Sequence, residues 1–424
     1  MKRRNFLTAS AILTFLASTP VLGAKKKSTA TKAKAASSQR KGKSTGKAGK
    51  AGKSRTRRRV SARTAASSRP SAANAAPEDT SAANTPIEHR NVVKLPQEKP
   101  TDWHTVELQT DVGLHSNQGR ARLWLPLAQY KDTDWQRTIG HTWQGNFSKA
   151  GIYRDPVADM EIFFAEWPES IDTPKLQFIT QIATQNRQFD ITRRGVIAEQ
   201  AEVLRRNLHP TQLAPVDGIV HQTAERAIGR IKDPLAMGKA LYDWVIENAS
   251  FDTNGQGMGE AEISQLLGNG RFVGRSADIA LLFVALCRSV GIPARPVYGL
   301  RTGRSRLFNS LGATGELRSA QHCRAEFYIP GYSWIGVDPA AVCEAMREEP
   351  LSNTDPKVNV FKKLLFGFWE MNWIGFNTAQ DVILQGASGK ALPSLIYPVA
   401  ETAGGRFDGR NTNRMTYRAT ANHL

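Results

Sequence analysis

The first pattern in the chain is an alternation of apolar and polar residues that begins after Thr101. From Val106 to Val112 every second residue is Val, Leu or Thr, with polar residues between them. A period of two is typical of a half-buried β-strand. A second strand is predicted over Arg120–Leu125, after a turn of Ser, Asn, Gln and Gly. We therefore predict a β-rich N-terminal domain over residues 99–195.

Two helices are predicted further along the chain. Asp233 followed by Pro234 combines a capping residue with a first-turn proline, and apolar residues at helical spacing follow. The run Ile279–Cys287 is unbroken and apolar, with Asp278 before it and Gly291 after it. A helix that is apolar on all sides is a central, buried helix.

A strand, a long loop and a hairpin follow the buried helix. The strand is predicted over Pro296–Leu300, and the polar stretch Arg301–Ala320 is a loop long enough to be functional or mobile. The hairpin strands are predicted over Gln321–Tyr328 and Ser333–Asp338. After Pro350 the pattern weakens, and we predict a C-terminal extension over residues 346–424 with a terminal strand over Arg414–Ala419.

The register of the hairpin follows from its turn, because facing residues of an antiparallel pair have a constant index sum. A turn centred on Pro330 places His322 directly opposite Asp338 and collects the apolar residues on the other face. A carboxylate across a strand from an imidazole can orient it as a general base. A surface salt link is the alternative for this pair. Arg324 and Glu326 share its face, where they either line a cleft or form a surface ion pair with each other.

A third residue, at the start of a helix, extends this pair to a candidate catalytic triad. Ser276 stands at the start of the predicted buried helix, where the helix dipole and free backbone N–H groups favour negative charge. Taken alone, this serine is a helix cap. Beside His322 and Asp338, it is also a candidate nucleophile.

These three segments resemble the transglutaminase-like family of bacterial proteins. The resemblance covers about 65 residues: the run Gly274–Arg295, the segment His322–Tyr328 and the stretch Gly331–Pro339. It implies an α+β, papain-like core, which we assign to residues 205–345, and it implies that His322 is the catalytic histidine and Asp338 its orienting aspartate.

The resemblance fails at one position, because Ser276 stands where the family has its catalytic cysteine. Cys323 points to the opposite face of its strand, and Cys287 lies eleven residues along the helix, so neither can replace the thiol. A hydroxyl does not ionise near neutral pH as an activated thiol does. Loss of a triad nucleophile typically costs on the order of a millionfold in rate.

The net charge of +19 belongs to the N-terminus and not to the folded part. Residues 25–75 hold 17 Lys and Arg and no acid, and the first four residues add three more basic side chains. The remaining chain then has 37 basic and 38 acidic residues. Residues 25–98 are predicted to be a disordered basic linker that attracts anionic polymers or lipids without sequence-specific binding of nucleic acid, or merely a solubilising spacer.

The beginning of the chain predicts export. Residues 1–24 pair Arg3 and Arg4 with a short, weakly apolar stretch, which resembles a twin-arginine signal peptide and predicts a periplasmic or otherwise exported protein. The three cysteines form no disulfide framework. Metal clusters, phosphate loops and nucleotide fingerprints are absent from the sequence, so no cofactor or metal is predicted.

Three functions remain open from the sequence. The first is a catalytically degenerate relative that binds envelope peptide, protein or cell-wall material. The second is a serine-dependent amide hydrolase or acyl transferase that uses Ser276, His322 and Asp338. In the third, the basic linker carries the function and the folded part is a passive anchor.

Overall fold

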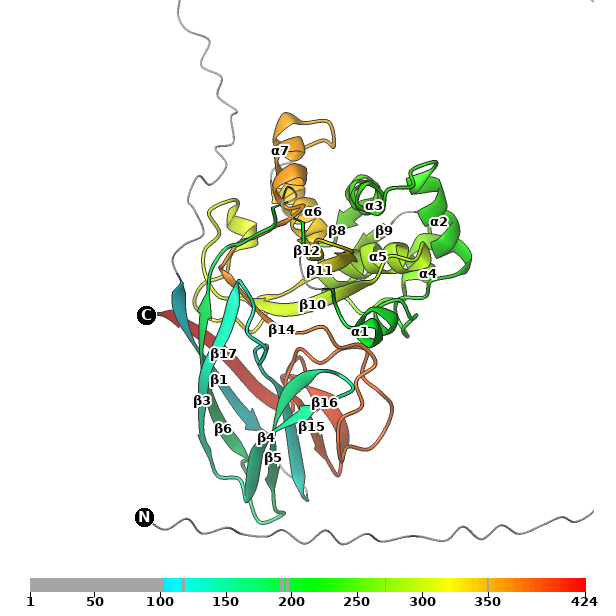
Figure 1. The fold of residues 1–424 in the computed structure, drawn as a ribbon. Coiled ribbons are helices and arrows are strands. Elements are labelled where there is room, and N and C mark those ends of the chain that lie inside the picture. The colour runs from blue at the N-terminus through cyan, green and yellow to red at the C-terminus, as the bar shows by residue number, and fades with distance from the viewer. Residues whose placement is uncertain are drawn as a thin grey trace, which may run out of the picture. The chain divides into compact units, whose positions relative to one another are not determined.

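The computed structural model describes residues 103–424, except 116–118, 191, 193, 196–197, 271 and 349–350. The predicted signal peptide and basic linker lie outside the described residues. Figure 1 shows a β region and an α+β core, and the β region is built of two antiparallel sheets. Among the described residues, none of the helices has the length and apolar character needed to cross a bilayer.

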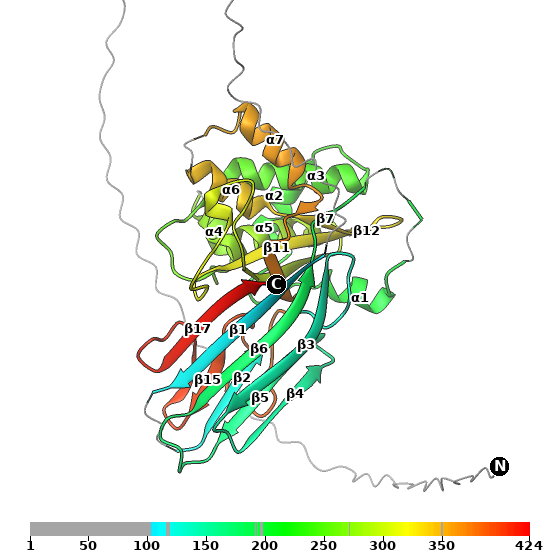
Figure 2. The ribbon, with the colours of Figure 1, turned by 90° about the vertical axis from the view of Figure 1, so that its left-hand side faces the viewer.

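The first sheet of the β region has the strand order β17–β1–β6–β3, and Figure 2 shows these strands side by side. The strands are β1 (His104–Leu114), β3 (Gln136–Gly145), β6 (Lys175–Thr184) and β17 (Met415–His423). The alternation predicted from Val106 to Val112 is confirmed, because every second residue there is buried. The predicted terminal strand is also present, and it pairs with β1, the first strand of the described residues.

The second sheet of the β region has the order β16–β15–β2–β5–β4. Its strands are β2 (Ala121–Pro126), β4 (Lys149–Asp155), β5 (Met160–Trp167), β15 (Val399–Thr402) and β16 (Gly405–Asp408). Phe163 of this sheet and Phe178 of the first sheet pack with ring centroids 4.8 Å apart. The C-terminal extension predicted after residue 345 therefore supplies strands to both sheets of the β region.

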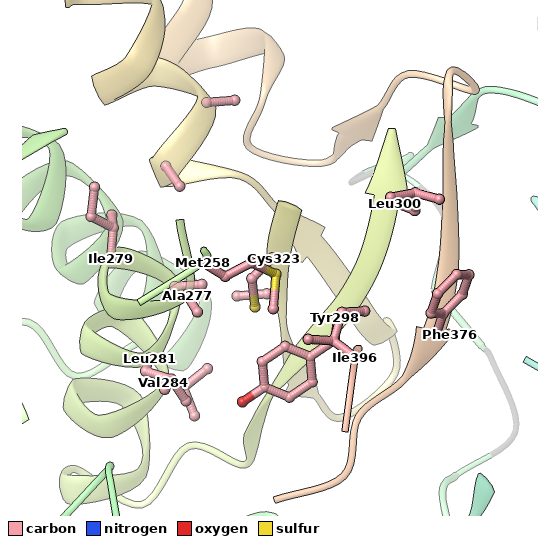
Figure 3. Packing of buried hydrophobic residues seen from close by; sticks show 14 of the residues in the cluster. Met258, Ala277, Ile279, Leu281, Val284, Tyr298, Leu300, Cys323, Phe376 and Ile396 are labelled. Atoms are coloured by element: carbon pink, nitrogen blue, oxygen red, sulfur yellow. The ribbon is translucent and has the colours of Figure 1, made fainter. Parts of the chain in front are cut away.

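The core is one buried helix packed on a four-stranded antiparallel sheet of order β12–β11–β10–β14. The strands are β10 (Ala294–Arg301), β11 (Gln321–Ile329), β12 (Ser333–Val337) and β14 (Trp373–Asn377). The helix is α5 (Ser276–Ser289), and its residues 276–288 are all buried. Figure 3 shows Ala277, Leu281 and Val284 of α5 on the side that faces Cys323 and Tyr298 of the sheet. The prediction of a central helix is confirmed.

Smaller elements surround this core. Asp233 caps α3 as predicted, with its side chain accepting a hydrogen bond from the backbone N–H of Ala236. The helices are α1 (Ala201–Arg206), α2 (Gly218–Ile228), α3 (Pro234–Asn248), α4 (Ile263–Gly268), α6 (Pro339–Glu348), α7 (Pro356–Leu364) and the 3-10 turn η1 (Asn309–Leu311). Two short pairs complete the set: β8 (Ala249–Phe251) with β9 (Phe272–Gly274), and β7 (Arg187–Gln188) with β13 (Phe368–Trp369).

The register of the β11–β12 hairpin differs from the predicted one by two residues. Ile329 pairs with Ser333, so the turn has three residues and is centred on Gly331. Gly331 and Ser333 adopt positive φ angles of 83° and 66°, which accommodate this turn. A shift by two leaves every side chain on its predicted face. However, it moves His322 from a position directly opposite Asp338 to a diagonal one.

Three tryptophans lie where the β region meets the core. Trp135, just before β3, packs against Trp369 and Trp373 with ring centroids 5.2 and 5.8 Å away. Arg187 lies over the Trp369 ring at 4.4 Å, and Arg324 lies over the Trp373 ring at 4.5 Å. The alternating aromatic rings and guanidinium groups stabilise this contact by apolar burial and cation–π attraction.

Candidate active site

Ser276 is the first residue of α5 and only 3% of its surface is exposed. The helix begins there because Asp278, in the first turn, accepts a hydrogen bond from the backbone N–H of Arg275 at 2.8 Å. The Ser276 Oγ accepts a hydrogen bond from the backbone N–H of Cys323 at 3.3 Å. The serine is therefore in contact with strand β11, which carries His322, but through the backbone of that strand.

His322 and Asp338 form a buried pair. The Nε2 of His322 lies 2.9 and 3.1 Å from the two carboxylate oxygens of Asp338, and both residues are 2% exposed. The backbone N–H of Ala341, in the first turn of α6, donates to the same carboxylate at 2.9 Å. The predicted contact between the imidazole and the carboxylate is present, and its burial excludes the surface salt link.

Arg324 faces Asp338 in the observed register. Its Nε lies 3.2 Å from the Asp338 carboxylate, although the direction is not that of a hydrogen bond. Glu326 instead pairs with Arg187 and with Arg295, the latter at 2.6 Å. Both Arg324 and Glu326 are buried, so the predicted surface ion pair between them is wrong. The charge of Arg324 is directed to the candidate site.

Arg301, at the end of β10, contacts the other nitrogen of the histidine. Its guanidinium lies 3.0 Å from the His322 Nδ1 and forms a two-point ion pair with Glu344 of α6 at 2.6 and 3.1 Å. A second guanidinium nitrogen donates to the carbonyl of Ser310 at 2.8 Å. Because arginine can only donate, the Nδ1 of His322 accepts and the proton sits on Nε2, facing Asp338.

In this arrangement Arg301 is hydrogen-bonded to the ring nitrogen that a triad histidine uses as its base. The Nδ1 lone pair, which would take a proton from Ser276, is held by Arg301. Among the described residues, no hydrogen bond joins the Ser276 Oγ to the His322 ring. The structure brings the three predicted residues into one buried region but links only His322 and Asp338.

The charges around the site fix the protonation of both linked residues. Burial and then the charge of Arg301 lower the pKa of His322, against the opposing effect of Asp338. Burial opposes ionisation of Asp338, but His322 and Arg324 outweigh it and lower the pKa of this carboxyl. At neutral pH the pair is therefore a neutral imidazole beside a carboxylate.

Arg301 and Glu344 were not among the residues predicted from the sequence. The predicted strand ended at Leu300, one residue too early, and Arg301 was assigned to the loop. Gly299 pairs with His322, and Arg301 lies two residues further along the same strand, hence on the same face. A strand extended by one residue would have shown this neighbour. Nothing in the local sequence pattern indicates Glu344, which reaches the site from α6.

Other chemistry is limited in the described part of the chain. Cys287, Cys323 and Cys343 are buried free thiols, and burial raises the pKa of each. Figure 3 shows Cys323 on the face of β11 that packs against α5, as its place in the strand predicts. Across the described residues, no three His, Cys, Asp or Glu side chains gather as metal ligands would.

The raised pKa of Asp278 predicts a pH dependence of the protein's stability. Burial raises its pKa to about 6 from 3.8, although backbone N–H groups partly oppose the shift. The folded state therefore holds this proton more tightly than the unfolded state, and the associated stability falls as pH rises from about 4 to about 6. We expect the stability of Asp278→Asn, relative to wild type, to increase over this pH range by up to about 3 kcal/mol.

Urea unfolding of both proteins at pH 4, 5, 6 and 7 measures this difference. The comparison between the two proteins removes the contributions of all other titrating groups. A difference that stays constant across these pH values would show that folding does not shift the pKa of Asp278, and it would contradict this prediction.

Comparisons with known proteins define the class of the core. Residues 221–339 match the transglutaminase-like superfamily, so the chain contains a transglutaminase-like domain. A proposed cysteine protease from Cytophaga hutchinsonii has a similar structure, with a TM-score of 0.50 and 14% identity over 76% of this chain and 92% of that one. The predicted α+β fold with a transglutaminase-like core and a preceding β-rich region is confirmed.

Other relatives carry less information. An uncharacterised Haemophilus influenzae protein is 29% identical over 339 residues, which cover 75% of this chain and 91% of that protein. The periplasmic domain of TgpA from Pseudomonas aeruginosa shares 17% identity over 63% of this chain and 81% of that one, with a TM-score of 0.33. The similarity to the Haemophilus influenzae protein extends well beyond the transglutaminase-like domain.

Proposed function

We propose that this chain is a non-catalytic transglutaminase-like protein of the bacterial cell envelope, which binds peptide or cell-wall material. The observation that carries the proposal is the contact between Arg301 and the Nδ1 of His322. A general base must have a free lone pair next to the nucleophile. Here that lone pair accepts a hydrogen bond from a guanidinium that is itself fixed by Glu344.

The nucleophile position supports the same conclusion. Serine replaces cysteine, and its hydroxyl accepts a hydrogen bond from the backbone of β11 without contacting the imidazole. Ser276 and His322 are 3% and 2% exposed, so a substrate carbonyl cannot approach them in this arrangement.

The segment between Arg301 and Ala320 is attached at several points. The backbone N–H of Leu317 donates to the carbonyl of Ala419 at 2.7 Å, and the Asn372 side chain donates to the carbonyl of Leu311 at 3.0 Å. These bonds join the segment to β17 and to the residue before β14. A lid that opens readily would have fewer such attachments.

The envelope location rests on the sequence. A signal-like N-terminus resembling the twin-arginine type is followed by a basic segment that would attract anionic lipids or cell-wall polymers. We propose that this segment increases the local concentration of the folded part at such a surface.

A serine hydrolase or acyl transferase is the second candidate. The buried contact of 2.9 Å between His322 and Asp338 favours it, because this contact orients a triad histidine. For this candidate, Arg301 would have to leave Nδ1 when substrate binds.

Covalent labelling separates the two candidates. The full chain is exposed to a serine-directed fluorophosphonate, and its intact mass is compared with that of Ser276→Ala. We expect no adduct at Ser276, because no base activates its hydroxyl. One adduct on the wild type that is missing from Ser276→Ala would establish the serine enzyme and reject the non-catalytic proposal.

A further inference from the structure

A cleft of about 230 Å³ lies where the β region meets the core. One wall comes from the ends of β1, β6 and β17, and the other from the loop after β10 and the segment before β14. This is smaller than the roughly 300–1,000 Å³ typical of pockets for drug-sized ligands. The cleft therefore suits the end of a chain better than a long segment of one.

Two arginines, Arg304 and Arg306, line the cleft together with a single acid, Glu370. His104 and His423 also line it. The Glu370 carboxylate already accepts hydrogen bonds of 2.6 Å from the Ser305 hydroxyl and from the backbone N–H of Arg306. Because these hydrogen bonds hold the Glu370 carboxylate against the loop, the exposed guanidinium of Arg304 is the group at the cleft that can bind an anion.

Arg304 is the side chain best placed to bind that anion. It is exposed, and no acid or carbonyl pairs with its guanidinium among the described residues. The nearby loop backbone is fixed, because the backbone N–H of Ala313 donates to the carbonyl of Gly303 at 2.9 Å. A guanidinium on an ordered loop can bind a carboxylate through two parallel hydrogen bonds.

The remaining walls offer an apolar surface and an acceptor. Phe368 and Met371 line the cleft with apolar side chains. Asn372 also lines it, and its amide nitrogen donates to two backbone carbonyls, which leaves its Oδ1 without a partner among the described residues. A buried acceptor without a donor costs free energy, so a ligand N–H at this point would be stabilising.

We propose that the cleft binds the carboxyl-terminal end of a peptide. The terminal carboxylate pairs with Arg304, the last amide N–H approaches Asn372, and a small terminal side chain packs on Phe368 and Met371. This inference rests on the proposed function, because it names the binding site and the ligand chemistry of a non-catalytic protein. It does not require Ser276 or the imidazole of His322.

The cleft nevertheless touches the charge network of the candidate active site. The backbone carbonyl of Glu370 accepts a hydrogen bond of 3.2 Å from Arg324, whose guanidinium lies beside Asp338. In this arrangement Arg324 connects a wall of the cleft to the His322–Asp338 pair. The network thus supports the cleft wall while carrying out no reaction.

Calorimetric titration of the full chain with N-acetyl-alanyl-alanine tests the proposal. The L,L and D,D peptides are compared as free acids and as carboxamides. We expect the better-bound free acid to bind at least about tenfold more tightly than its carboxamide, as for a charge-assisted hydrogen bond. A preference for L,L indicates protein C-termini, and a preference for D,D indicates cell-wall peptides.

Arg304→Gln tests the residue directly, with Arg230→Gln as its matched control. Arg230 is also exposed but lies two residues after α2 and does not line the cleft, and the change removes the same charge. We expect only Arg304→Gln to abolish the preference for the free acid.

Equal affinities for acid and carboxamide, an unchanged preference in Arg304→Gln, or no binding at several millimolar peptide would each reject the cleft. None of these results would be evidence for catalysis, because fluorophosphonate labelling tests catalysis separately. An adduct at Ser276, conversely, would reject the non-catalytic proposal whatever the peptide titration shows.

Discussion

Replacing Ser276 with cysteine is expected to give a thiol that iodoacetamide alkylates slowly at pH 7. Removing the Arg301–Glu344 ion pair from the same protein is expected to accelerate that alkylation at least about tenfold. The two changes are Arg301→Met and Glu344→Gln. The methionine is an uncharged, apolar side chain of similar length to arginine, and the glutamine avoids leaving an unpaired acid. The cysteine restores the nucleophile, but only the second step frees the histidine.

The physical reason lies in the protonation of the thiol. A buried thiol without a base is hard to ionise, as Cys343 illustrates, because burial raises its pKa to about 12. Once the Nδ1 of His322 is free, it can take the thiol proton and stabilise the thiolate as an ion pair. The gain in thiolate fraction exceeds the accompanying loss of intrinsic nucleophilicity when the starting pKa is raised.

The controls isolate the role of Arg301. Wild type gives the background from its three buried cysteines, and Ser276→Cys with Glu344→Gln alone gives the effect of changing the acid. Peptide mapping locates the alkylated residue. If Ser276→Cys already reacts as fast as the triple variant, Arg301 does not block the histidine, and the main support for a non-catalytic protein is lost.

The central helix and the faces of the hairpin could be predicted because they follow from periodicity. The run Ile279–Cys287 has no polar residue to expose, and alternation along β11 places His322 and Cys323 on opposite faces whatever the register. These local patterns were enough to select Ser276, His322 and Asp338 as the candidate site. Their catalytic role stays a prediction.

The register and the contacts of the site could not be predicted in the same way. A hairpin register depends on turn length, and here Ser333, the first residue after the three-residue turn, adopts a positive φ, which is uncommon outside glycine. Arg301 and Glu344 are 43 residues apart and meet only because α6 packs beside the end of β10. A pairing of this kind belongs to tertiary structure and leaves no periodic signal.

The assembly of the β region was equally hidden from local patterns. Strand β17 was predicted as the terminal strand of a C-terminal extension, with no partner assigned, and it pairs with β1 about 300 positions earlier in the chain. Its sequence alternates as any edge strand does, and alternation specifies a face but not a partner. The same limit applies to β15, which pairs with β2.

Asp338→Ala is expected to destabilise the fold by about 3–5 kcal/mol, the cost typical of breaking a buried ion pair by removing one partner. The carboxylate lies 2.9 Å from His322 and 3.2 Å from Arg324, and all three side chains are buried. Without it, the Arg324 guanidinium stays buried beside Arg301 with a backbone carbonyl of Glu370 as its remaining acceptor. Urea unfolding followed by tryptophan fluorescence measures the loss.

Two further variants distinguish charge from packing. Glu161→Ala removes a surface partner of Arg154, which is 55% exposed, and should cost at most about 1 kcal/mol. Adding Arg324→Met to Asp338→Ala should recover part of the lost stability, because the apolar replacement removes the uncompensated charge. A double variant no more stable than Asp338→Ala would mean that lost contacts, and not an unpaired guanidinium, cause the effect. Recovery would show that Asp338 is retained for the charge it balances, a role that persists without catalysis.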